Sequence, residues 1–173
     1  MFPYLFTATI GSGTDAFFET MSGYTATGAT ILDDIEALPR SILLWRSLTH
    51  WMGGMGIIVL AIAILPLLGI GGMQLFSAEA PVLGGDKLHP RISDTAKRLW
   101  LIYVGLTLTN ALLLFVSGMP FFDAINHAMS TMASGGFSTK NASIGHWKYM
   151  PKIQNITIFF MILEGSKIVL LYD

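Results

Sequence analysis

The sequence predicts an all-α polytopic membrane protein in which short re-entrant helices alternate with long helices in repeated units. Hydrophobic residues make up 53% of the 173 residues and charged residues only 12%, whereas soluble domains have about 25% charged residues. Two long runs, residues 51–76 and 99–122, contain no charged side chain. In addition, two short segments with similar sequences lie 108 positions apart.

The overall composition excludes several other classes of protein. The net charge is −1 and the ten basic residues are not gathered in one block, which argues against nucleic acid as a partner. The chain has no cysteine, so it forms neither disulfides nor thiolate metal sites. The first six residues lack the basic region and cleavage pattern of a secretory signal, and they are typical of the end of a longer segment.

The first part of the chain predicts a helix that is too short to span a bilayer. Residues 1–12 are apolar and are interpreted as the end of an outer helix, because a spanning helix needs about 20 residues. Thr14 and Asp15 predict an N-cap for a helix over residues 15–24, with Glu19 in its second turn. About ten residues at roughly 1.5 Å each cover half of the hydrocarbon thickness, which is typical of a re-entrant pore helix.

The strongest signal for a spanning helix is the apolar run at residues 51–76, which follows an acidic, turn-prone loop at residues 33–40. This inner helix could begin as early as Ser41, and Pro66 could kink it. Closely spaced glycines predict close helix contact near its start: Gly53, Gly54 and Gly56.

Residues 77–98 carry the densest charge and predict a connector with an amphipathic helix from about Pro90. Four basic side chains place this connector on the cytoplasmic side by the positive-inside rule: Lys87, Arg91, Lys97 and Arg98. Residues 99–122 then predict an outer helix that runs from inside to outside.

The rest of the chain follows the same order as the first part. Residues 123–132 predict a second half-length helix, residues 140–152 a polar loop, and residues 153–163 the start of a truncated inner helix. Three lysines in the polar loop count against the orientation given above. The expected domains are a first repeat at 1–76, the cytoplasmic connector at 77–98 and a second repeat at 99–173.

A gapless shift of 108 positions superposes the two half-length helices and the segments that follow them. Five pairs between residues 15 and 28 and their partners are identical: Asp15/Asp123, Ala16/Ala124, Met21/Met129, Ser22/Ser130 and Gly28/Gly136. Thr30 falls on Ser138. Because repeats set a fold, we expect two units, each with a spanning helix, a half-helix, an extended glycine-containing segment and a second spanning helix.

The extended segments have the chemistry of an ion path. Non-helical backbone at membrane depth is tolerated where protein buries it or where it lines an aqueous cavity. Backbone carbonyls can replace the hydration shell of a monovalent cation, and the half-helices point partly negative ends toward it. Gly28 and Gly136 are expected to supply positive φ angles. The predicted ligands are the backbone carbonyls of eight residues: Thr25, Ala26, Thr27, Gly28, Ala133, Ser134, Gly135 and Gly136.

Three stretches of the sequence resemble one known family. Residues 17–30, 43–56 and 133–139 look like the membrane subunit of Trk-type bacterial potassium uptake systems, in the Trk/Ktr/HKT superfamily. The most specific part is Trp45-Arg46-Ser47 followed by Gly53-Gly54-Met55-Gly56. The resemblance covers nearly the whole chain, although the tail from Glu164 to Asp173 matches weakly.

The resemblance implies K⁺ as the transported ion, with no covalently bound cofactor and no enzymatic activity. It implies four repeats around one K⁺ path in the bacterial cytoplasmic (inner) membrane, with one filter glycine per repeat, here Gly28 and Gly136. It also implies a homodimer and a cytosolic nucleotide-binding regulatory subunit. Against that pattern the chain is interpreted as a fragment that lacks most of the first outer helix, part of the second inner helix and two entire repeats.

Several ionisable or ambiguous residues have more than one interpretation. Gly135 is an alternative to Gly136 as the filter glycine, although the gapless register favours Gly136. Arg46 and His50 lie one turn apart, and a structural pair with the acidic loop at residues 33–36, or interfacial snorkelling, is preferred to a functional role. His127 occupies the position of Glu19 in the second half-helix, where helix packing is preferred to a ligand role.

Two other functions remain open at the level of sequence. In a non-conducting membrane scaffold or assembly subunit, the small residues would only pack helices. In a secondary transporter, broken helices would surround a solute site. Enzymatic catalysis is not indicated, because the serine and threonine hydroxyls have no matched base and the acidic and histidine residues have no metal-ligand spacing.

Overall fold

In a computed structural model, the structure describes residues 1–64 and 88–166, and every regular element in those ranges is a helix. They are α1 (Phe2–Phe6), α2 (Gly13–Tyr24), α3 (Arg40–Ile64), α5 (Leu88–Val116), α6 (Phe121–Met132), the 3₁₀ helix η2 (Ser143–Trp147) and α7 (Pro151–Ser166). The prediction of a helical chain is confirmed for these ranges. Residues 65–76 of the first long run, residues 77–87 of the connector and the tail from residue 167 lie outside them.

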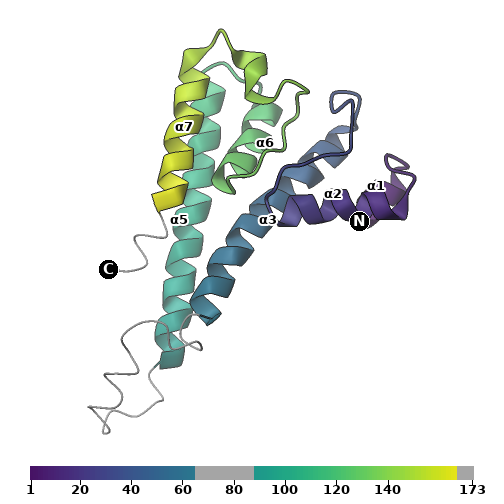
Figure 1. The fold of residues 1–173 in the computed structure, drawn as a ribbon. Helices are drawn as coiled ribbons and strands as arrows, with labels where there is room; N and C mark the ends of the chain where they lie inside the picture. Colours follow the sequence, from purple (N-terminus) through teal and green to yellow (C-terminus); the bar gives the residue numbers. More distant parts are fainter. Residues whose placement is uncertain (65–87, 167–173) are drawn as a thin grey trace, which may run out of the picture.

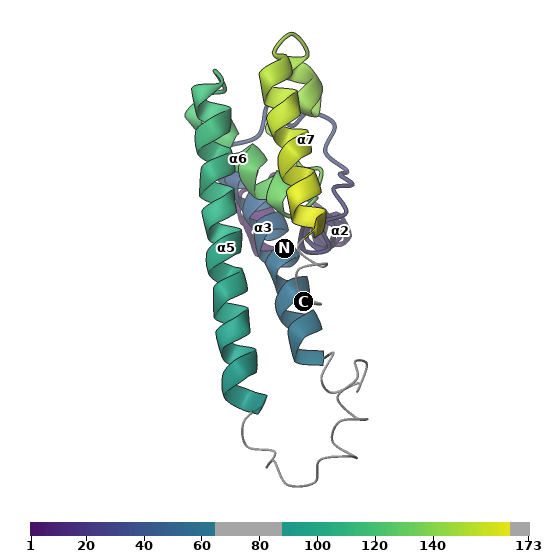
Figure 2. The same cartoon turned by 90° about the vertical axis from the view of Figure 1, so that its left-hand side faces the viewer.

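Helix α6 lies at the centre of the arrangement, because it packs against α3, α5 and α7. Figure 1 shows α3 with α2 on one side and α5 on the other, and Figure 2 shows α5 running alongside the rest as the longest helix. The buried apolar side chains form one cluster around α1, α2 and the start of α3, and another between α5, α6 and α7. A third cluster, of Tyr103, Met132 and Phe160, packs against Trp51 and Met55 of α3. Each half of the chain therefore has an apolar cluster of its own, and the third cluster joins the two halves through α3.

The two half-length helices are each 12 residues long, and both ends of α6 lie 108 positions after those of α2. Ser12 is the N-cap of α2, and its Oγ accepts a hydrogen bond from the backbone N of Asp15 (3.4 Å). The expected cap at Thr14 and Asp15 is therefore wrong, because Asp15 lies in the first turn, where its carboxylate is near the positive end of the helix dipole. Helix α6 begins two residues before Asp123, directly after Pro120.

Helix α5 crosses the expected boundary at residues 98 and 99 without a break, so the connector helix and the outer helix are one helix. It ends six residues before Phe122, because the chain reverses at Gly118, which has a φ of +101°. The backbone N of Met119 donates to the carbonyl of Leu114 (3.2 Å), and both side chains are buried in the same apolar cluster. This hydrogen bond and its apolar contact are the features of a Schellman helix end.

The remaining long segments differ in detail from the expected boundaries. Residues 1–12 form only the short helix α1 and a turn after it. Helix α3 begins at Arg40, directly after Pro39. None of the helices, over the residues that the structure describes, is both long enough and apolar enough to cross a membrane. Large apolar side chains are exposed along α5 and α7: Leu101, Leu108, Leu112, Val116, Ile158 and Ile162.

Candidate functional site

Both half-length helices end in the same turn. Ala26 (φ 52°) and Ser134 (φ 48°) lie in the left-handed region directly after α2 and α6. This conformation costs a residue other than glycine about 1–2 kcal/mol. The next residue in each copy donates its backbone N–H to a carbonyl five residues earlier: Thr27 to Ser22 at 3.1 Å, and Gly135 to Ser130 at 2.9 Å. The turn redirects each helix into a non-helical segment, residues 25–32 in the first copy and 133–140 in the second.

Segments 25–32 and 133–140 approach each other at the two predicted filter glycines. A Cβ added to Gly28 would lie 2.7 Å from Cα and 2.8 Å from N of Gly136, and Gly28 also has a φ of +75°. Gly136 does not have a positive φ, so that expectation is wrong, and a Cβ there would lie no closer than 3.4 Å to Gly28. Position 28 therefore requires glycine for two reasons, whereas position 136 has room for a small side chain.

The C-terminal ends of α2 and α6 meet neighbouring glycines of α3. A Cβ on Gly53 would clash with the carbonyl oxygen of Tyr24, and a Cβ on Gly54 would lie 2.9 Å from Cα of Ala133. A Cβ on Gly56 would meet nothing within 4 Å, so two of the three expected glycine contacts are present. The partly negative ends of the two short helices thus converge on one turn of α3.

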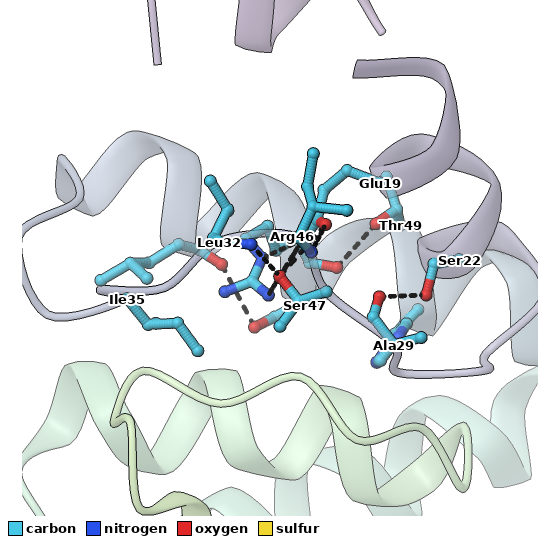
Figure 3. A network of polar contacts seen from close by, with 12 residues as sticks. Glu19, Ser22, Ala29, Leu32, Ile35, Arg46, Ser47 and Thr49 are labelled. Atoms are coloured by element: carbon cyan, nitrogen blue, oxygen red, sulfur yellow. Dashed lines mark hydrogen bonds and ion pairs between the residues drawn. The ribbon is translucent and has the colours of Figure 1, made fainter. Parts of the chain in front are cut away.

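A buried ion pair supports the first segment. Arg46 on α3 and Glu19 on α2 lie 3.0 Å apart, and their side chains are only 1% and 0% exposed (Figure 3). Glu19 also accepts hydrogen bonds from Oγ1 of Thr30 (2.9 Å) and the backbone N of Ile31 (3.2 Å), and Arg46 donates to Oγ1 of Thr30 (3.1 Å).

The expected pairing of Arg46 with the acidic loop is therefore wrong, because α2 packs directly on α3 and places Glu19 within reach. Ser22 adds a hydrogen bond to the carbonyl of Ala29 (2.5 Å).

The second segment has a support at the equivalent positions. His127, which occupies the place of Glu19, lies 3.2 Å from Oγ of Ser138, which occupies the place of Thr30. The Ser138 hydroxyl accepts from the backbone N of Lys140 (2.9 Å), as the Thr30 hydroxyl accepts from the backbone N of Leu32 (3.2 Å). His127 is buried, and its packing role is consistent with the interpretation from sequence. The same hydroxyl geometry is thus held by a carboxylate in one copy and an imidazole in the other.

His50 connects α3 to the second segment. Its imidazole stacks on the ring of Phe137, with centroids 4.1 Å apart and planes inclined by 10°. Its Nδ1 lies 3.2 Å from Oγ of Ser130, and a Cβ on Gly135 would clash with the imidazole. The interpretation of His50 as an interfacial residue is wrong, because the side chain is fully buried and lies against Ser130, Gly135 and Phe137.

The hydroxyl side chains of the remaining predicted site residues form local hydrogen bonds. Oγ1 of Thr25 lies 2.8 Å from Oγ1 of Thr27, and Thr25 also donates to the carbonyl of Met21 (2.8 Å). Oγ of Ser134 lies 2.7 Å from Oε2 of Glu164 on α7. The hydroxyls of Thr25 and Thr27 therefore stabilise the first turn, and the Ser134 hydroxyl ties the second turn to α7.

The loops beyond the two segments are joined by Asn141. Its Oδ1 accepts from the backbone N of Ile35 (2.7 Å), and its Nδ2 donates to Oδ1 of Asp34 (3.0 Å). This hydrogen bond lowers the pKa of the exposed Asp34 carboxyl below its ordinary value. Lys140 and Glu36 form a half-exposed ion pair at 3.4 Å beside it. The loop at residues 34–36 is thus tied to Lys140 and Asn141.

The buried charges of Glu19 and Arg46 neutralise each other. Within the described ranges, no three acidic or histidine residues are grouped as a metal site would require. Sequence reasoning missed the roles of Glu19, Thr30 and Asn141 in holding the segments. A signal was present for Glu19, because a carboxylate in a largely apolar helix requires a buried partner.

Comparison with known proteins places the chain among cation transporters. The model of a family described as "TrkH: Cation transport protein" matches residues 5–173. Proteins named Trk system potassium uptake protein TrkH are 56% identical in Salmonella typhimurium and Escherichia coli, over 88% of this chain and 32% of each relative. The crystal structure of the potassium transporter TrkH from Vibrio parahaemolyticus is similar with a TM-score of 0.74 and 47% identity, over 88% of this chain and 29% of that one. The chain spans about a third of the length of these relatives.

Proposed function

Because the chain belongs to the TrkH family of cation transport proteins, we propose that it forms part of a pore for K⁺ uptake whose selectivity comes from backbone carbonyls. The carbonyls of residues 25–28 and 133–136 coordinate the ion in this proposal. Relatives named as potassium uptake proteins support K⁺ as the ion. The activity is transport without chemical conversion, so no catalytic residue is assigned.

The observation that carries the proposal is the meeting of the two segments at Gly28 and Gly136. Each segment follows a 12-residue helix and the same left-handed turn, at a spacing of 108 residues. Side chains are excluded from the contact at position 28, so backbone atoms of both segments lie together. The converging C-terminal ends of α2 and α6 add partly negative charge, which favours a cation.

The proposed repeats follow from this assignment. The first repeat, residues 1–76, has α2 as its pore helix and α3 as its inner helix. Residues 77–98 form a cytoplasmic connector, and the second repeat, residues 99–173, has α5 as its outer helix, α6 as its pore helix and α7 as the start of its inner helix. In this proposal the protein is a multi-pass protein of the bacterial cytoplasmic membrane, and the exposed apolar side chains of α5 and α7 face lipid or further repeats.

The proposal also includes two partners, because it starts from membership of this family. The complete transporter is a homodimer, and a cytosolic nucleotide-binding subunit regulates it. Since the chain spans about a third of its relatives, a closed pore requires the remaining repeats. The proposal is therefore best tested in a chimera in which this chain replaces the segment that it matches in the Escherichia coli relative.

The test measures K⁺ uptake, with Na⁺ as a competitor, in a bacterial strain that lacks its own K⁺ uptake systems. Gly28→Ser should lower the preference for K⁺, because its side chain meets the backbone of Gly136. Gly136→Ser has room for its Cβ, so it should reach the membrane in normal amount and still lower the preference. Gly145→Ser is the matched control, because a Cβ there meets nothing within 4 Å and the residue lies in η2.

The results distinguish this proposal from its rivals. A chimera that reaches the membrane but takes up no K⁺ would contradict a role in conduction and favour a scaffold. Unchanged ion preference in both glycine variants, at normal protein amount, would contradict the carbonyl filter. Uptake that requires a second coupled solute would favour a secondary transporter with broken helices.

A further inference from the structure

One aromatic side chain joins the two repeats next to the proposed filter. Phe137 directly follows Gly136 and is only 3% exposed. The guanidinium carbon of Arg46 lies 4.1 Å from the centroid of its ring, and the His50 imidazole stacks on it at the same centroid distance. A Cβ on Gly23 of α2 would lie 3.5 Å from its Cε2. The ring of the second repeat is thus held by α2 and α3 of the first repeat.

The contact has no counterpart in the first segment. The position equivalent to Phe137 is Ala29, whose carbonyl accepts a hydrogen bond from Ser22 of its own repeat. Segment 25–32 is therefore held by polar groups of its own pore and inner helices. Segment 133–140 is also held by its own helices, through His127 and Glu164, but in addition it inserts a ring between helices that belong to the other repeat.

The same arginine holds both segments. Arg46 donates to Thr30 and pairs with Glu19 on the side of the first segment, and it lies over Phe137 on the side of the second. A guanidinium over an aromatic face is attracted by the ring quadrupole, most strongly where water is excluded. Arg46 is 1% exposed, so water is excluded here. A displacement of either segment therefore changes the contacts of the other through one buried side chain.

From this geometry we infer that Phe137 is a positioning residue: through Arg46 and His50 it fixes the second filter segment against the first, so that the two segments determine ion preference as one unit. The inference rests on the proposed function, because it concerns the same segments. It assigns a role in selectivity to a side chain that does not itself touch the ion.

The experiment uses the chimera described above and measures the KM and maximal rate of K⁺ uptake, and its inhibition by Na⁺. Phe137→Leu removes the aromatic face and keeps an apolar side chain, so K⁺ preference over Na⁺ should fall about fivefold. Phe137→Tyr keeps the face and should retain the preference of the parent chimera. Uptake is normalised to the amount of protein in the membrane, so that poor folding does not register as lost preference.

The matched control is a second arginine–phenylalanine pair, Arg40 and Phe122. Arg40 lies 5.6 Å from the ring centroid of Phe122, at the start of α6 and away from both segments. Phe122→Leu should therefore leave the ion preference unchanged. If Phe137→Leu is not recovered in the membrane, Phe137→Met makes the same change with a more flexible side chain and is measured instead.

A double-mutant cycle tests whether the two segments act together. Thr30→Val removes the hydroxyl that joins the first segment to Glu19 and Arg46. If Arg46 couples the segments, the effects of Thr30→Val and Phe137→Leu on ion preference should not multiply. Independent effects, or unchanged preference in Phe137→Leu, would overturn the inference. If the glycine variants change the preference while Phe137→Leu does not, the proposed function stands and only the role of Phe137 is lost.

Discussion

The buried ion pair of Glu19 and Arg46 gives a stability prediction that can be worked out from its contacts. Arg46→Met removes two of the groups that contact the Glu19 carboxylate, Nε and Nη2, each at 3.0 Å. The carboxylate keeps only the hydroxyl of Thr30 and the backbone N of Ile31. Because both partners are at most 1% exposed, the unpaired charge stays out of water, and we expect a loss of about 3–5 kcal/mol in the free energy of unfolding.

The double variant distinguishes an unpaired charge from lost packing. Glu19→Gln alone leaves the Arg46 guanidinium buried without its carboxylate, so it should also destabilise by about 3–5 kcal/mol. Glu19→Gln combined with Arg46→Met removes both charges, so its cost should be smaller than the sum of the single costs by about 2–3 kcal/mol. The exposed pair of Lys140 and Glu36 is the control, and Lys140→Met should cost less than about 1 kcal/mol because solvent screens it.

The assay is the thermal unfolding of the purified 173-residue chain in detergent, with each variant compared at low and high salt. A loss of about 3–5 kcal/mol corresponds to a fall in Tm of about 6–20 °C for a chain of this size. High salt should reduce the effect of Lys140→Met and leave that of Arg46→Met unchanged, because buried pairs are screened much less. Single variants that lower Tm by less than about 3 °C, or a double variant that equals the sum, would refute the reasoning.

Two further predictions concern single backbone and loop features. Gly118→Ala should destabilise the fold by about 1–2 kcal/mol, because the positive φ of Gly118 is unfavourable for alanine. Gly105→Ala in the interior of α5 should stabilise it by about 0.5–1 kcal/mol, because alanine favours a helix more than glycine does. A Cβ at either position meets nothing within 4 Å, so the two changes in Tm should have opposite signs, and equal signs would contradict the prediction. Asn141→Ala should raise the pKa of Asp34 toward its ordinary value. A carboxyl whose pKa is lowered in the folded state stabilises that state at pH values above its unfolded pKa of about 4. This stabilisation is lost as the pH falls through the folded pKa, so the difference in Tm between the parent and Asn141→Ala should narrow in acid. A difference in Tm that does not change with pH would mean that the hydrogen bond to Ile35, not the one to Asp34, carries the effect.

The sequence was most informative where a local pattern recurs. The spacing of 108 residues, read from Gly28 and Gly136 and from residues before them, recurs in the helix bounds, in the turns at Ala26 and Ser134 and in the hydroxyl supports. Helix ends were less accurate, because each depends on one capping group. Ser12 rather than Thr14 starts α2, although the Ser-x-x-Asp spacing that identifies it was present.

The long-range contacts could not be read from sequence. Arg46 had several acidic residues nearby in the chain, and its partner lies 27 positions away because α2 packs on the glycine-containing turn of α3. The stacking of Phe137 on His50 joins residues 87 positions apart. Periodicity predicts which face of a helix is apolar, but it does not predict which buried polar groups two faces bring together.

The divergence of the two hydroxyl supports has a consequence for how such a protein can evolve. In an assembly of identical subunits, a substitution appears in every copy at once, and a change that helps one position must be tolerated at all of them. Here the equivalent positions 19 and 127 are encoded separately, and they already hold a carboxylate and an imidazole. Selection can therefore adjust the support of segment 133–140 while the Glu19–Arg46 pair continues to secure segment 25–32. The two segments can thus become asymmetric in single mutational steps.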